Sequence, residues 1–154
     1  MDNRKKLHDY SIVMICFSVL NVFTFLGTVI STFIDGSFEK SLNSVEADIV
    51  GIVKIVLIIF GVLMMILALS DALIGLKGLK VSREPNADKG YIVVAKIFFV
   101  LNVFAVISSV ASLINNTTPI IDGILSLANT VLDVIVYALF IKAATAVRRD
   151  LIKK

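Results

Sequence analysis

One apolar stretch near the C-terminus carries polar side chains along a single helical face. Their spacings of four, three, four and four align them on an α-helix: Asp122, Ser126, Asn129, Asp133 and Tyr137. Asp133 falls near the middle of its apolar window, where an ionised carboxylate costs several kcal/mol unless it is protonated or paired. Its presence therefore calls for either a partner or a function.

Two asparagines in other apolar stretches are candidates to share that site. The segment VLNVF occurs twice and places Asn21 and Asn102 81 positions apart, and the same offset pairs Tyr10 with Tyr91. Each asparagine follows its tyrosine by 11 positions, which is about 16 Å of helix and close to the middle of a bilayer. We therefore predict one buried polar cluster near the midplane: Asp133, Asn129, Asn21, Asn102 and Tyr137.

The cluster has three interpretations that the residues leave open. As interhelical contacts, its hydrogen bonds would each contribute about 0.6–2 kcal/mol to a bundle or an oligomer. As a proton or cation site, Asp133 would gain and lose a proton as a substrate or ion binds. As a ligand site, the same amides and hydroxyl would hold a small polar molecule.

The composition sets the class of protein that must position these residues. Hydrophobic residues make up 58% of the 154-residue chain, and the charged residues gather in short segments between long apolar windows. Each window is long enough for a helix to cross the hydrocarbon of a bilayer. We predict an all-α integral membrane protein with a single four-helix transmembrane domain over 1–154, its spans at about 10–34, 49–76, 91–114 and 119–141.

Charge and repetition predict how the spans are arranged. Lysine and arginine gather before the first span, between the second and third, and after the fourth, whereas the other two connections hold only Lys40. By the positive-inside rule, both termini are cytoplasmic. The repeated VLNVF segment suggests a parallel two-plus-two repeat of helical hairpins about an axis along the membrane normal. We expect a multi-pass protein of a bacterial-type plasma membrane.

Two further features of the second span predict helix contacts. Asp71 lies near its inner end, at a depth similar to that of Lys96 in the third span, so an ion pair at the cytoplasmic boundary is expected. Small residues seven positions apart, Gly61, Ala68 and Gly75, give the span a face suited to close helix packing.

The remaining residues that bear chemistry argue against catalysis. His8 stands alone in the N-terminal tail and Cys16 has no CxxC partner, and no catalytic or phosphate-loop motif is present. We expect no enzyme activity, no cofactor and no metal. The formal charge of +3 comes with basic residues that flank spans, so nucleic acid is not an expected partner.

Two hypotheses of function follow from the polar cluster. In the first, an oligomeric membrane protein passes a cation, a proton or a small solute in the manner of a channel or transporter, because Asp133 is costly in hydrocarbon. In the second, the protein conducts nothing and is an accessory subunit, an immunity protein or a scaffold. The expected partners are the lipid bilayer and either further copies of the chain or other subunits of a membrane complex.

Overall fold

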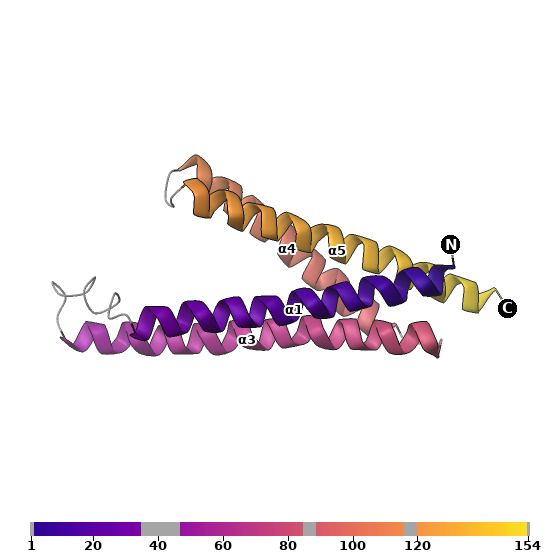
Figure 1. The fold of residues 1–154 in the computed structure, drawn as a ribbon, viewed down its shortest axis with the longest axis horizontal. Helices are drawn as coiled ribbons and strands as arrows, with labels where there is room; N and C mark the ends of the chain where they lie inside the picture. Colours follow the sequence, from indigo (N-terminus) through magenta and orange to yellow (C-terminus); the bar gives the residue numbers. More distant parts are fainter. Residues whose placement is uncertain (1, 35–46, 85–88, 116–119, 154) are drawn as a thin grey trace. The chain divides into compact units, whose positions relative to one another are not determined.

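Helices account for the regular structure of the described chain (Figure 1). The computed structural model describes residues 2–34, 47–84, 89–115 and 120–153. The helices in these ranges are α1 (Asn3–Ile34), α3 (Ala47–Arg83), α4 (Gly90–Ile114) and α5 (Ile120–Ile152). The prediction of an all-α fold is confirmed for this part of the chain.

Three helices continue beyond the predicted spans into segments rich in basic residues. α1 begins at Asn3 instead of near Tyr10, α3 continues to Arg83, and α5 continues to Ile152. An apolar window reports the length of chain suited to hydrocarbon, whereas lysine, arginine and alanine are all good helix formers and extend a helix past that boundary. Lys80 and Arg83 also lie in the last turn of α3, where a cation is favoured by the helix dipole.

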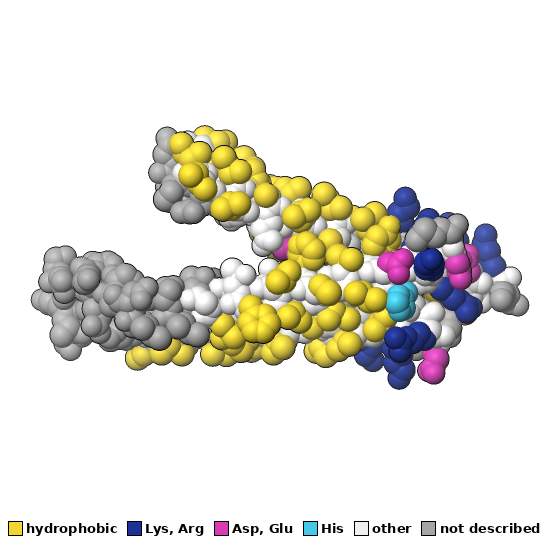
Figure 2. Space-filling model, viewed as in Figure 1, with side chains coloured by type: hydrophobic (Ala, Val, Ile, Leu, Met, Phe, Trp, Pro, Cys, Tyr) yellow, Lys and Arg dark blue, Asp and Glu magenta, His cyan; other side chains and the backbone are white. Residues whose placement is uncertain are grey.

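The four helices are long and apolar enough to cross a membrane. Large apolar side chains are exposed along them (Figure 2), and Phe104, Ile114 and Ile121 expose 63%, 73% and 73% of their surface. Such extensive apolar surface suits hydrocarbon better than water. The stretches that satisfy the length and composition of a span are Asn3–Gly27, Gly61–Arg83, Gly90–Ile114 and Gly123–Ile152.

The chain divides into two compact units, each of which is described by itself. Unit 1 comprises Met1–Ile15 and Leu73–Lys154, and unit 2 comprises Cys16–Ala72. Unit 1 therefore holds the start of α1, the end of α3, and all of α4 and α5. The single domain over 1–154 stays a prediction, as do the orientation of the termini and the two-plus-two repeat.

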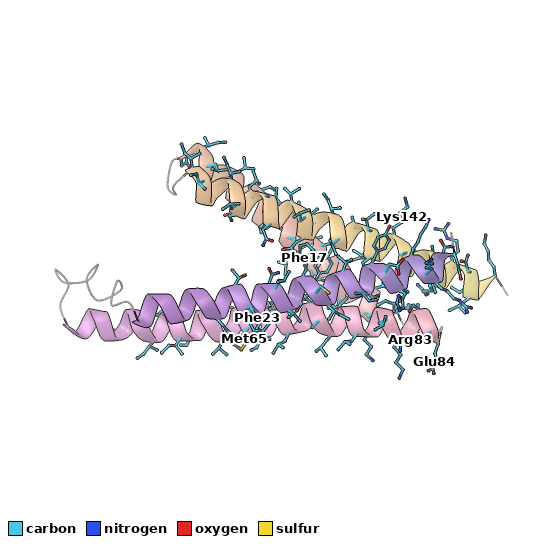
Figure 3. All side chains as sticks on the ribbon, in the orientation of Figure 1. Phe17, Phe23, Met65, Arg83, Glu84 and Lys142 are labelled. Carbon is cyan, nitrogen blue, oxygen red and sulfur yellow. The ribbon has the colours of Figure 1, made fainter. Side chains whose placement is uncertain are left out.

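The core of unit 1 lies next to its charged end. All four helical segments contribute to it, and the side chains of Leu7, Phe140 and Ala144 are completely buried. Lysine and arginine gather at this end of unit 1 (Figure 2). Figure 3 shows Lys142 on α5 and Arg83 with Glu84 at the end of α3. The best-packed part of the unit is thus adjacent to its most polar surface.

Small residues let α1 and α3 approach closely in unit 1. A Cβ atom added at Gly75 would lie 2.8 Å from Ile15 Cγ1 and 3.0 Å from the Ser11 carbonyl oxygen. One added at Gly78 would meet Ser11 and the ring of Phe140. Both glycines are needed here because neighbouring atoms fill the space of a side chain.

The same face of α3 packs against α1 in unit 2. Ser18 Oγ donates a hydrogen bond of 2.5 Å to the Ala68 carbonyl oxygen, and a Cβ atom at Gly61 would lie 3.1 Å from Phe25 Cζ. Ala68 of α3 meets Ser18 of α1, and Gly61, earlier in α3, meets Phe25, later in α1. The two helices therefore run antiparallel. The expected packing role of Gly61, Ala68 and Gly75 is therefore confirmed.

Candidate functional site

Two aromatic pairs fix the register of α4 against α5 in unit 1. Tyr91 meets Phe140 edge to face, with ring centroids 6.1 Å apart and planes at 80°. Phe98 stacks on Tyr137, with centroids 6.3 Å apart and planes at 14°. Advancing along α4 therefore corresponds to moving back along α5, as in an antiparallel hairpin.

This register brings two residues of the predicted site to one level. Asn102 lies one turn beyond Phe98 on α4, and Asp133 lies one turn before Tyr137 on α5, so both move the same way along the hairpin from the stacked rings. Both side chains are half-buried. Asn102 Nδ2 donates to the Phe98 carbonyl oxygen at 3.0 Å, so this amide bonds to its own helix.

The α5 polar face, defined as Ser126, Asn129, Asp133 and Tyr137, becomes progressively buried toward the charged end of unit 1. Ser126 and Asn129 are exposed, Asp133 is half-buried and Tyr137 is only 4% exposed. Asn129 is exposed, and its membership in one buried cluster stays a prediction. The Phe98–Tyr137 stack forms the buried end of the face. Asp122, on the same helical face, has no described side-chain surroundings.

The hydroxyl group of Thr130, next to this face, is satisfied by the backbone of α5. Thr130 Oγ1 donates at 3.0 Å to the carbonyl oxygens of both Ser126 and Leu127. A hydroxyl inside hydrocarbon must find such a partner, and the carbonyl of the preceding turn is the nearest one. This hydroxyl therefore bonds along the helix, unlike Ser18, which bonds across helices.

The other predicted residues are divided between the two units. Asn21 is half-buried on α1 in unit 2, whereas the other four members of the cluster belong to unit 1. Asp71 is half-buried in unit 2, and Lys96 is exposed in unit 1. The participation of Asn21 in the cluster and the ion pair between Asp71 and Lys96 both stay predictions.

The chemistry that the α5 polar face offers is hydrogen bonding and exchange of a proton or cation at a carboxylate. Within the described ranges, no group of three or more His, Cys, Asp or Glu side chains lies close enough to hold a metal ion. His8 Nδ1 lies 3.3 Å from Asp9 Oδ1 near the start of α1, and Cys16 is exposed. The face is therefore best described as a polar surface around Asp133.

Phe98 is a residue of this region that sequence reasoning did not single out. Its ring covers Tyr137 and its carbonyl oxygen accepts the Asn102 amide. Its position one helical turn before Asn102 is the signal that could have identified it, because residues four apart share a helix face. Phe17 occupies the equivalent place four residues before Asn21, just ahead of the other VLNVF segment.

Comparison of the chain with known protein families, with characterised proteins and with solved structures gives no significant match. The four apolar helices place it in the class of multi-pass helical membrane proteins by length and composition. The argument for function therefore rests on the residues of this chain.

Proposed function

We propose that this protein passes a cation, a proton or a small polar solute across a membrane along a hydrated path lined by the α5 polar face. The observation that carries the proposal is Asp133, a half-buried carboxyl group inside a long apolar helix. We further propose that the path is completed in a homo-oligomer or in a complex with another membrane subunit. Exposed Ser126 and Asn129 would then face water or polar groups rather than lipid.

The cost of Asp133 is the energetic basis of the proposal. An aspartate at the centre of a membrane helix costs about 2.5–3.5 kcal/mol on insertion scales. Ionisable residues at this depth most often face a bundle interior or a water-filled cavity and mark ion or proton pathways. An apolar residue at position 133 would avoid this cost, so a functional role accounts for the carboxyl group.

The gradient of burial along the α5 polar face favours a gated path rather than an open pore. The polar face is exposed at Ser126 and Asn129, and the stacked rings of Phe98 and Tyr137 lie one helical turn beyond Asp133. A solute that reached Asp133 from the loop between α4 and α5 would have to pass this aromatic pair to reach the charged end of unit 1. Movement of the rings would therefore gate the passage.

Flux through proteoliposomes tests the proposal. The purified protein and its Asp133→Asn variant are reconstituted, and proton flux and potassium flux are followed with a pH-sensitive dye and a potential-sensitive dye. Asp150→Asn is the matched control, since it removes a carboxylate from the charged end of the same helix. We expect flux in the parent and in the control and its loss in Asp133→Asn. Absence of flux in the parent for protons, cations and small polar solutes would overturn the proposal.

A second candidate function is favoured by the hydrogen bond between Ser18 and Ala68. This bond shows a polar side chain joining two apolar helices, which is the role that a non-conducting accessory subunit, immunity protein or scaffold would give to the whole polar cluster. Under this alternative, Asp133→Asn lowers the melting temperature or changes the subunit stoichiometry, and the parent protein shows no flux. Thermal unfolding and mass measurement in detergent, done beside the flux assay, separate the two functions.

A further inference from the structure

A strongly basic cavity lies between α4 and α5 at the charged end of unit 1. Its volume is about 320 Å³, and its lining includes four cationic side chains and one hydroxyl: Lys96, Arg148, Arg149, Lys153 and Thr145. Lys96 comes from the second turn of α4, Thr145, Arg148 and Arg149 come from the last turns of α5, and Lys153 directly follows that helix. The helical spacing of 145, 148, 149 and 152 places one face of α5 along the cavity.

Arg148, which lines the cavity, also carries a hydrogen-bond donor without a protein acceptor. Arg148 Nε is buried and, among the residues that the structure describes, has no hydrogen-bond partner. A buried donor without an acceptor is costly, and for a charged group the cost is larger. Guanidinium groups bind phosphate with two parallel hydrogen bonds, and the Nε–H group commonly supplies one of them. An oxyanion bound in this cavity would therefore offer the guanidinium group of Arg148 an acceptor.

Neighbouring acidic residues do not neutralise this cavity. Asp150 accepts a hydrogen bond of 2.9 Å from Asn3 Nδ2 and lines a different cavity together with Asp2 and Arg4. A cavity at the end of α3 combines Lys80 and Arg83 with Glu84. Those two sites contain charges of both signs, whereas the described lining of the cavity between α4 and α5 contains no acid.

We propose that the cavity between α4 and α5 binds the phosphate group of an anionic phospholipid. The shared chemistry is that of any phosphate oxyanion, but its position favours a lipid. The cavity lies at the ends of two helices that are long and apolar enough to cross a membrane, which is the level of the headgroups. Ile92 and Ile152 also line it, and Ile152 is 69% exposed, so an acyl chain would find apolar contact beside the charges. Basic pockets between membrane helices bind anionic headgroups in this way.

Lipid titration of the full-length protein tests the proposal. Delipidated protein in detergent is titrated with phosphatidylglycerol, with phosphatidylcholine of the same acyl chains, and with inorganic phosphate, and bound ligand is counted by native mass spectrometry. The test variant is Lys96→Gln with Arg148→Gln. The matched control is Lys80→Gln with Arg83→Gln, which removes the same charge from the same end of unit 1.

We expect phosphatidylglycerol to bind more tightly than phosphatidylcholine and the test variant to lose about 30-fold in affinity for it, because each basic residue near a membrane surface contributes to anionic lipid binding. The single variant Lys96→Gln changes an exposed side chain, so it preserves the fold and should lose about fivefold. An equal loss in test and control variants, or no preference for phosphatidylglycerol, would overturn the proposal. Saturable binding of inorganic phosphate without binding of phosphatidylglycerol would assign the cavity to a free anion. That result would also overturn the proposal that the cavity binds a phospholipid.

Discussion

Replacing Gly78 with alanine should destabilise unit 1, although alanine is the better helix former. The added Cβ would lie 2.5 Å from Ser11 Oγ and 2.8 Å from Phe140 Cζ, and both of these side chains are completely buried. Ser11 is also held by its hydrogen bond of 2.6 Å to the Leu7 carbonyl oxygen. Neither neighbour can therefore withdraw without disturbing the core.

Two opposing effects set the size of the change. Overpacking a well-packed site costs about 1–3 kcal/mol, and exchanging glycine for alanine within a helix returns about 0.5–1 kcal/mol. The free energy of unfolding should therefore fall in Gly78→Ala, by up to about 2.5 kcal/mol. The assay is reversible unfolding by sodium dodecyl sulfate in mixed micelles, followed by far-ultraviolet circular dichroism.

Gly27→Ala is the matched control, because a Cβ atom at Gly27 meets nothing within 4 Å. Only the helix propensity then acts, and the variant should be stabilised by about 0.5–1 kcal/mol. Adding Ser11→Ala to Gly78→Ala removes one of the crowded atoms and should recover part of the loss. If Gly78→Ala and Gly27→Ala shift the unfolding curve equally, the close contact among Gly78, Ser11 and Phe140 is refuted.

The same unfolding assay checks two further predictions. Phe140→Ala should lower the free energy of unfolding by about 3–5 kcal/mol through the cavity it leaves, whereas Phe104→Ala, at a side chain 63% exposed, should change it by less than about 0.5 kcal/mol. Equal losses in Phe140→Ala and Phe104→Ala would contradict the burial of Phe140 in the core of unit 1. Ser18→Ala should cost about 0.6 kcal/mol by removing a bond between helices, whereas Ser70→Ala should be near neutral because Ser70 Oγ bonds to the carbonyl oxygen of Ile66 in its own helix. A larger loss at Ser70 would contradict the assignment of Ser18 as the interhelical contact.

The four helices of the described ranges and one packing face could be predicted from the sequence. Long apolar windows report the hydrocarbon thickness directly, which is why the four helices agree with the predicted spans at their apolar ends. Gly61, Ala68 and Gly75 recur every seven residues, and this spacing identifies the contact face of α3 because small residues allow helices to approach closely.

Other features depend on partners that lie far away in the sequence. The apolar windows do not predict the polar ends of α1, α3 and α5, because they measure hydropathy and not helix propensity. The sequence shows that Gly78 is small, but only the structure shows that Phe140 fills the space beside it. Likewise, helical spacing aligns Asp133 with Asn129 and Tyr137, whereas the Phe98–Tyr137 stack determines the level at which α4 meets them.

The charged end illustrates the same limit. The basic residues after Lys142 predict topology by their number alone. Which of these basic residues line a cavity, and which lie elsewhere on the surface, depends on the face of α5 that meets α4. Arg148 therefore emerges as a candidate ligand-binding residue only when its Nε is found buried without an acceptor.

Water access to the α5 polar face is the most direct test of the proposed path. In a Cys16→Ser background, which removes the only cysteine, Asn129→Cys and Ile135→Cys are each treated in proteoliposomes with a membrane-impermeant maleimide. Both positions are exposed in the structure, but Ile135 lies away from the polar face, and a thiol in hydrocarbon does not form the reactive thiolate. The hydrated path predicts rapid labelling of the Asn129 variant and little labelling of the Ile135 variant. Failure of the Asn129 variant to react, or equal reaction of the two, would contradict it.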